Sequence, residues 1–172
     1  MKNLFKCEQL AYIKAMLNGS RRAKEVLLDH LDTGRFCEEA EVELAKSLIS
    51  KPADVKEVFL ESIQEYYLCH EAQIELVKAL ASGLPEVKEV LLAYVKKYLL
   101  YSEARFELII TLIINPADAK EVLLVLLHEC SFYEQFPHLR GRKILREEVD
   151  ELARLAKQGI PEAKEIMNTI RP

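Results

Sequence analysis

Apolar and polar residues alternate along the chain with the period of a helix. Between residues 42 and 49 the apolar side chains recur at the spacing of one side of an amphipathic helix. Residues 58–63 repeat this spacing in a second segment. The sequence lacks the strict alternation that is typical of a half-buried strand. The pattern therefore predicts an all-α fold.

The helical pattern recurs at a fixed interval. Lys-Glu-Val triplets begin at four positions, each 32 residues after the one before: Lys24, Lys56, Lys88 and Lys120. A fifth copy, with isoleucine in place of valine, begins 44 residues after the fourth, at Lys164. This last interval is twelve residues longer than the others, which indicates an insertion near residues 130–143.

Each 32-residue unit holds two helical segments. Proline opens several of the second segments, for example in Asn115-Pro116-Ala117-Asp118, where Asn115 is expected to cap the helix. Two helices alone cannot bury their apolar faces, so successive pairs must stack into a continuous core. We therefore predict one domain over residues 1–172, an α-solenoid of about five two-helix repeats with the insertion between repeats four and five.

This plan resembles the HEAT-like and armadillo-like group of helical-hairpin repeats over nearly the whole chain. The tetratricopeptide pattern is a poorer match, because the chain contains no Trp and its period is shorter than the 34 residues of that repeat. The resemblance implies a scaffold or partner-binding role and carries over no catalytic residue.

Departures from the repeat are informative, because the copies serve as controls for one another. At one position the successive residues are Lys14, Lys46, Lys78, Ile110 and Arg154. At a second position they are Asn18, Ser50, Ser82, Ile114 and Gln158. The fourth repeat is thus apolar where the other repeats are expected to meet water.

The insertion that follows is aromatic and basic. Its candidate contact residues are Phe132, Tyr133, Phe136, Arg140 and Arg142. Two interpretations stay open. In the favoured one the insertion folds back over Ile110, Ile114 and Leu126 and buries them. In the other, the isoleucines and the insertion together form an interface with a partner or with a second copy of the chain.

Charged side chains also form rows at the repeat interval. Lys24 and its equivalents should line up with the glutamates that follow them, as weak ion pairs between repeats on a solvated face. The alternative is a charged groove in which an acidic row selects a partner with a basic segment. That row consists of Glu43, Glu75, Glu107 and Glu151.

Tyrosines allow a similar pair of interpretations. Tyr66 and Tyr98 share one repeat position, and Tyr67, Tyr94 and Tyr101 lie nearby in the sequence. Packing between repeats is favoured over a peptide-binding strip, because tyrosine can bury its ring while its hydroxyl stays in water.

Composition narrows the partners and the location. A formal charge of −4 argues against extensive nucleic-acid binding, which needs a concentrated basic face. No apolar run approaches the roughly 20 residues that span a membrane, and the first residues do not resemble a secretory signal. We therefore predict a cytoplasmic protein.

Residues that could carry chemistry are scattered. Cys37 and Cys69 occupy equivalent positions of neighbouring repeats and should stand about 10 Å apart, beyond the reach of a disulfide. His128, Cys130 and His138 match no common zinc spacing. We predict no catalytic residue, no metal site and no cofactor.

The leading prediction is a protein-interaction or scaffold module that binds a protein partner, or itself, through its helical surface and the insertion. One alternative is a nucleic-acid-binding repeat protein that uses Arg21 and Arg22 together with the basic residues of the insertion. The other is a helical enzyme with a site at the insertion, for which no motif was found.

Overall fold

A computed structural model describes residues 4–134 and 142–170, and it describes no side chain between residues 129 and 146. All regular structure in the described ranges is helical, which confirms the all-α prediction. The described elements are α1 (Lys6–Leu17), α2 (Arg21–Leu31), α3 (Glu38–Ser47), α4 (Pro52–Glu65), α5 (His70–Ala79), the 3-10 helix η1 (Leu80–Ser82), α6 (Pro85–Lys97), α7 (Ser102–Thr111), α8 (Pro116–Glu134), α9 (Arg142–Lys157) and α10 (Pro161–Ile170).

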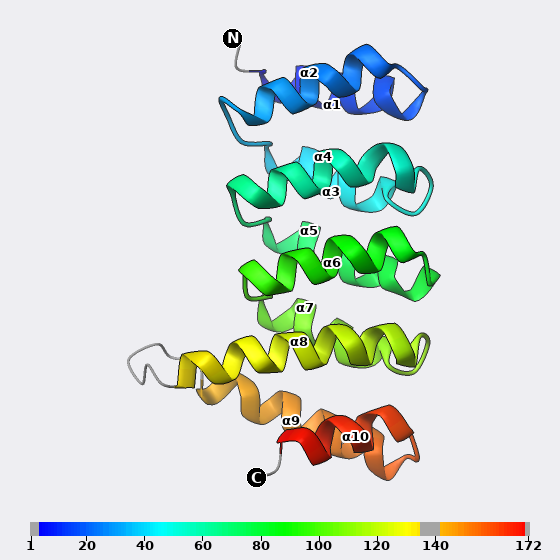
Figure 1. Cartoon of the computed structure of the whole chain (residues 1–172), viewed down its shortest axis with the longest axis vertical. Helices are drawn as coiled ribbons and strands as arrows, with labels where there is room; N and C mark the ends of the chain where they lie inside the picture. Colours follow the sequence, from blue (N-terminus) through cyan, green and yellow to red (C-terminus); the bar gives the residue numbers. More distant parts are fainter. Residues whose placement is uncertain (1–3, 135–141, 171–172) are drawn as a thin grey trace.

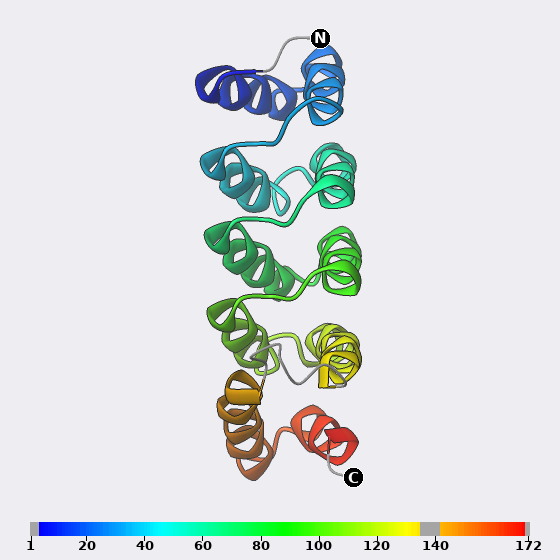
Figure 2. The same ribbon diagram turned by 90° about the vertical axis from the view of Figure 1, so that its left-hand side faces the viewer.

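The helices lie in two columns. Odd-numbered helices contact one another in succession from α1 to α9, and even-numbered helices do the same from α2 to α10. Figure 2 shows these columns side by side, and Figure 1 shows the antiparallel pairs following one another along the longest axis. We number the pairs along the chain, so that helix pair two is α3 with α4 and helix pair four is α7 with α8.

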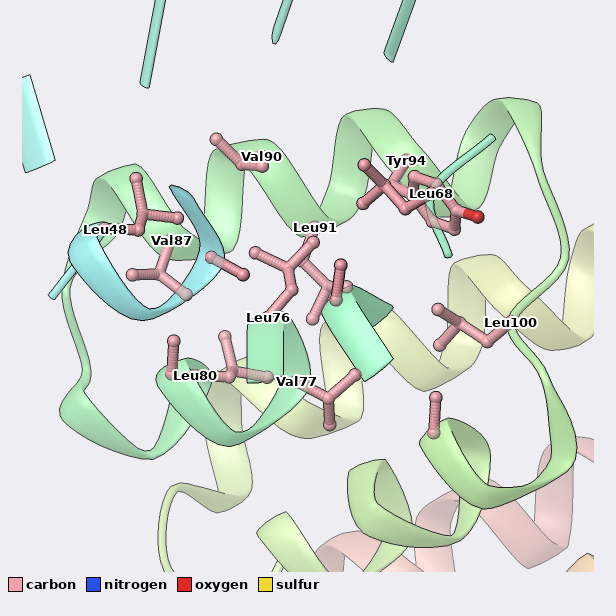
Figure 3. Packing of buried hydrophobic residues seen from close by; sticks show 14 of the residues in the cluster. Leu48, Leu68, Leu76, Val77, Leu80, Val87, Val90, Leu91, Tyr94 and Leu100 are labelled. Atoms are coloured by element: carbon pink, nitrogen blue, oxygen red, sulfur yellow. The ribbon is translucent and has the colours of Figure 1, made fainter. Parts of the chain in front are cut away.

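Apolar side chains between the columns form one continuous core. The cluster of buried residues extends from Ile13 in α1 to Met167 in α10. Figure 3 shows part of it, where Leu76 and Val77 of α5 lie below Leu91 of α6. Each helix therefore buries one side against its pair partner and the helices before and after it in its column, and it leaves the other side to solvent.

The starts of the even-numbered helices follow the local sequence. Proline is the first residue of α4, α6, α8 and α10, where its missing N–H costs no helical hydrogen bond. Asn115 precedes α8, but its side chain is used differently from the expected cap. Its Nδ2 atom donates to the Leu80 carbonyl at 2.9 Å and to an Asp118 carboxylate oxygen at 2.8 Å. Asn115 thus ties the α7–α8 turn to the preceding helix pair.

The insertion expected near residues 130–143 does not form a single loop. Its first residues belong to α8, which has 19 residues where α6 has 13. Its last residues belong to α9, which has 16 residues where α7 has 10. Many of the extra residues therefore lengthen two helices, a distinction that the repeat spacing alone could not make.

Candidate functional site

Three exposed isoleucines lie at the end of α7 and in the turn that follows it. The exposed fractions are 43% for Ile110, 56% for Ile113 and 64% for Ile114. Their neighbours Ile109 and Leu112 are buried in the core. We call Ile110, Ile113 and Ile114 the isoleucine surface. Soluble proteins seldom leave such groups of apolar side chains exposed without a partner.

The backbone places these side chains together. Beyond α7, the Leu112, Ile113 and Ile114 amides each donate to the carbonyl three residues earlier, at 3.0 to 3.1 Å. The chain therefore continues for one more turn with 3-10 hydrogen bonding before it enters α8. Residues three and four apart share one side of such a spiral, so Ile113 and Ile114 lie next to Ile110.

The α3–α4 turn is a matched comparison for the α7–α8 turn. The Ser50 and Lys51 amides donate to the Ser47 carbonyl at 3.1 and 2.9 Å, as the Ile114 and Asn115 amides donate to the Thr111 carbonyl at 3.0 and 2.8 Å. The exposed positions in this turn are Lys46, Ile49 and Ser50, which correspond to Ile110, Ile113 and Ile114. The two turns thus share these two backbone hydrogen bonds although their exposed residues differ. The fold therefore does not require isoleucine at 110 or 114.

A carboxylate without an ion-pair partner accompanies the isoleucine surface. In α5, Lys78 Nζ lies 3.3 Å from Glu75, and in α9, Arg154 Nε lies 2.8 Å from Glu151. Glu107 occupies the same repeat position in α7 and is half-buried, but the residue three positions later is Ile110. Within the described part of the chain, Glu107 forms no ion pair.

The structure separates the two groups of predicted site residues. Ile110 and Ile114 are exposed rather than covered, whereas Leu126 is buried within pair four. The isoleucine surface adjoins the start of α8, whereas residues 132 and 133 lie near its other end, about 28 Å away at 1.5 Å per residue. The exposure of Ile110 and Ile114 contradicts the burial of these two side chains in the favoured sequence interpretation.

The predicted residues of the insertion lie partly outside the structural description. The backbone of residues 132 and 133 belongs to α8 and residue 142 begins α9, but their side chains are not described. Residues 136 and 140 lie wholly outside the described ranges. The roles predicted for Phe132, Tyr133, Phe136, Arg140 and Arg142 therefore remain predictions.

Tyrosines divide between packing and exposure. Tyr94 is buried and Tyr66 is half-buried, as packing between repeats requires, whereas Tyr67 and Tyr101 are exposed. The exposed pair lines a shallow groove of about 550 Å³ beside the α2–α3 and α4–α5 connections.

Polar side chains of this groove have partners within the chain. The Arg35 guanidinium lies 5.0 Å from the ring centroid of Tyr67, and its Nε is 3.3 Å from Glu41. The His70 ring meets the Tyr101 ring edge-on, and its Nε2 lies 3.0 Å from Glu103. Arg35 and His70 of the groove thus already have partners within the chain.

The predicted ion pairs between repeats are present. Lys56 reaches Glu89 of the next repeat at 2.5 Å and Lys88 reaches Glu121 at 3.1 Å. The same pairing joins Lys24 to Glu57 and Lys120 to Glu165. These groups are partly or largely exposed, so each pair stabilises the stack only weakly.

Four buried polar residues at 32-residue spacing were missed by the sequence analysis. These residues, which we call the buried polar slot, are Gln9, Glu41, Gln73 and Arg105. Gln9 Oε1 accepts the Cys37 amide at 2.8 Å, and Gln73 Oε1 accepts the Tyr101 amide at 2.9 Å. Each bond fixes the start of the next odd-numbered helix, so the slot keeps neighbouring pairs in register.

The slot carries opposite charges in pairs two and four. The Glu41 carboxylate accepts a hydrogen bond from the Cys69 amide at 2.5 Å and one from Arg35 Nε at 3.3 Å. Burial raises the pKa of this carboxyl group. Arg105 donates to the Leu100 carbonyl at 2.9 Å and to Glu148 in α9 at 2.5 Å. The sequence did contain one sign of the buried polar slot: polar residues recur at 32-residue spacing within segments that face the core.

Other chemistry is sparse in the described residues. Cys7, Cys37 and Cys69 are free thiols, and burial raises the pKa of Cys69 to about 11, which keeps it protonated at neutral pH. Within the ranges that the structure describes, no three His, Cys, Asp or Glu side chains are grouped as a metal site would require. No described helix combines the length and apolar character of a transmembrane segment.

Comparisons with protein-family models, curated proteins and solved structures each found no match to this chain.

Proposed function

We propose that this chain is a HEAT-like α-solenoid that serves as a protein-interaction scaffold, with the isoleucine surface as its binding site. The stacked pairs and the 32-residue spacing of equivalent core residues support the solenoid part of the proposal. Stacked helix pairs expose long helical surfaces, an arrangement suited to recognising another macromolecule. A cytoplasmic location remains part of this proposal.

The exposure of Ile110, Ile113 and Ile114 carries the functional part. A turn with the same backbone bonds in pair two has lysine and serine at two of these positions. Folding therefore does not explain the isoleucines, whereas burial against a partner would stabilise the complex by about 25 cal/mol for each Å² of apolar surface removed from water.

The test replaces exposed residues of pair four with the residues that stand at the equivalent positions of pair two. Changing Ile110→Lys and Ile114→Ser gives the α7–α8 turn the exposed residues of the α3–α4 turn. Affinity capture from the native host should recover a partner with the wild-type chain and lose it with this double variant.

Ile49→Ala provides the matched control, because Ile49 is the exposed isoleucine of the α3–α4 turn, with 48% exposure. Capture should be unchanged by this substitution. Equal capture by the wild type and by the Ile110→Lys, Ile114→Ser variant would contradict the proposed function, provided that both chains unfold at the same urea concentration.

A further inference from the structure

The isoleucine surface combines apolar side chains with one uncompensated negative charge. Glu107 lies one helical turn before Ile110 on α7, so its carboxylate borders the exposed methyl groups. Of its equivalents, Glu75 and Glu151 are each paired with a base in their own helix, whereas Glu43 forms no ion pair among the described residues although Lys46 stands three positions later. In α7 the base is replaced by Ile110, which both exposes an apolar side chain and leaves the carboxylate without a cation.

The neighbouring helices do not neutralise this charge. Lys78 in α5 and Arg154 in α9 stand at the position equivalent to Ile110, about one helix spacing of 8–10 Å to either side. Each already pairs with a carboxylate of its own helix. Glu103, one turn before Glu107 on α7, lies 3.0 Å from His70 Nε2 and accepts a hydrogen bond from the Ser102 hydroxyl. The surface therefore favours a partner that brings apolar groups and a cation together.

The same charge disfavours a second copy of the chain as the occupant. A two-fold dimer places one surface patch against itself, so the patch must be complementary to itself. Two isoleucine surfaces in contact would bring two Glu107 carboxylates to the border of one interface, where no described base is available to compensate them. Like charges at an interface oppose association, so the partner is a different molecule.

The shape of the surface indicates what kind of segment fits it. Ile110, Ile113 and Ile114 form a short apolar row on the side of a helix, between the parallel neighbours α5 and α9. Helices pack when side-chain ridges on one fit the grooves between ridges on another. A partner helix presents apolar residues at the matching spacing of three and four positions, with lysine or arginine at the edge of that stripe.

We propose that the isoleucine surface binds an amphipathic helix of another protein through aliphatic contacts to Ile110, Ile113 and Ile114 and an ion pair to Glu107. This inference rests on the proposed function and adds the chemical class of the partner.

Two synthetic helical peptides of about four turns test it. Both carry leucine at spacings of three and four, and they differ only in the residues that border the leucine stripe, which are lysine in one and glutamate in the other. Fluorescence anisotropy measures the affinity of each peptide for the full chain. The wild type should bind the lysine peptide about fivefold more tightly than the glutamate peptide, the effect expected of one partly exposed ion pair.

Variants assign that preference to the named residues. Glu107→Gln should abolish the preference between the peptides, and Glu107→Lys should reverse it. Ile110→Lys with Ile114→Ser should abolish binding of both peptides. The reciprocal change, Lys46→Ile with Ser50→Ile, should create a second binding site in pair two, where Glu43 takes the place of Glu107. The urea midpoint of each variant serves as the folding control.

Binding with no charge preference, or a preference that Glu107→Lys leaves in place, would overturn the inference. Failure of the lysine peptide to bind the wild type would also overturn it. A wild-type dimer in sedimentation that Ile110→Lys with Ile114→Ser dissociates would overturn it in favour of a second copy. In each case the proposed function still stands if capture of the host partner depends on Ile110 and Ile114, so the two failures are distinguishable.

Discussion

Helix pairs two and four have the same arrangement of helices and turn, but they differ in a buried polar residue and in the exposed residues of the turn. In the buried polar slot, Glu41 of pair two is replaced by Arg105 in pair four, a reversal of charge. On the surface, the positions of Lys46 and Ser50 become Ile110 and Ile114. The internal difference is compensated within the chain, since Glu41 pairs with Arg35 and Arg105 pairs with Glu148.

The surface difference has no such compensation among the described residues. The isoleucines stay exposed, and the residue three positions after Glu107 is Ile110, whereas the residue three positions after Glu43 in pair two is Lys46. A buried charge that another residue of the chain compensates is explained by the stability of the fold. Exposed apolar side chains that no described residue covers are explained better by a binding partner. Four predictions test this distinction, beginning with the largest effect on the free energy of unfolding.

Arg105→Gln should cost the most, about 3–5 kcal/mol, because it leaves Glu148 charged and buried without its cation. Adding Glu148→Gln should restore more than about half of the loss, since the remaining pair of amides carries no charge. Urea unfolding of the two variants and the wild type measures both values. A loss below about 1 kcal/mol for Arg105→Gln would show that the slot in pair four is not a buried charge pair.

Glu41→Gln should change how stability depends on pH. Burial raises the pKa of Glu41 in the folded chain, so the folded state holds this proton more tightly than the unfolded state does. The wild type should therefore lose stability relative to the variant as the pH rises from about 4 through the raised pKa, and the difference should then level off. Urea midpoints measured across this range provide the test, and a difference that grows in the opposite direction contradicts it.

Lys56→Ala tests the surface ladder, whose effect should be small in every pair. Removing the contact to Glu89 should cost no more than about 1 kcal/mol, because both groups are partly exposed. The loss should shrink further in about 1 M salt, where the screening length falls to about 3 Å. A larger loss that salt does not reduce would mean that the ladder contributes to stability more than its exposure allows.

Ile110→Lys with Ile114→Ser should have the smallest effect, within about 0.5 kcal/mol, because the exposed side chains contribute little to the core. Thermal and urea unfolding measure it. A loss above about 2 kcal/mol would indicate that these isoleucines are buried in the folded chain, as in the rejected interpretation.

Much of the fold followed from the sequence because the core depends on spacing. The helical spacing of apolar residues and the prolines that open the second helices predicted the helices of each unit, and the described chain is all-helical. Ile110 and Ile114 stood out for the same reason, as apolar residues at polar repeat positions. Spacing could not show how far the insertion lengthens α8, so it could not place the isoleucines and the insertion at opposite ends of pair four.

The buried polar slot escaped sequence analysis for a different physical reason. Glutamine, glutamate and arginine are usually exposed, and nothing near Gln73 in the sequence marks the Tyr101 amide, 28 residues later, as its partner. Burial of such a residue becomes favourable only when the next helix supplies that partner. Glu107 was recognised only as part of an acidic row, because its distinction lies in the absence of a base three residues later.

The most direct test of the isoleucine surface is an isoleucine-methyl NMR titration of the full chain with the leucine- and lysine-containing helical peptide. The account predicts that the methyl signals of Ile110, Ile113 and Ile114 shift, while the signal of Ile49 in the matched turn of pair two stays in place. Peptide binding that shifts the Ile49 signal and leaves the signals of Ile110, Ile113 and Ile114 unchanged would contradict it.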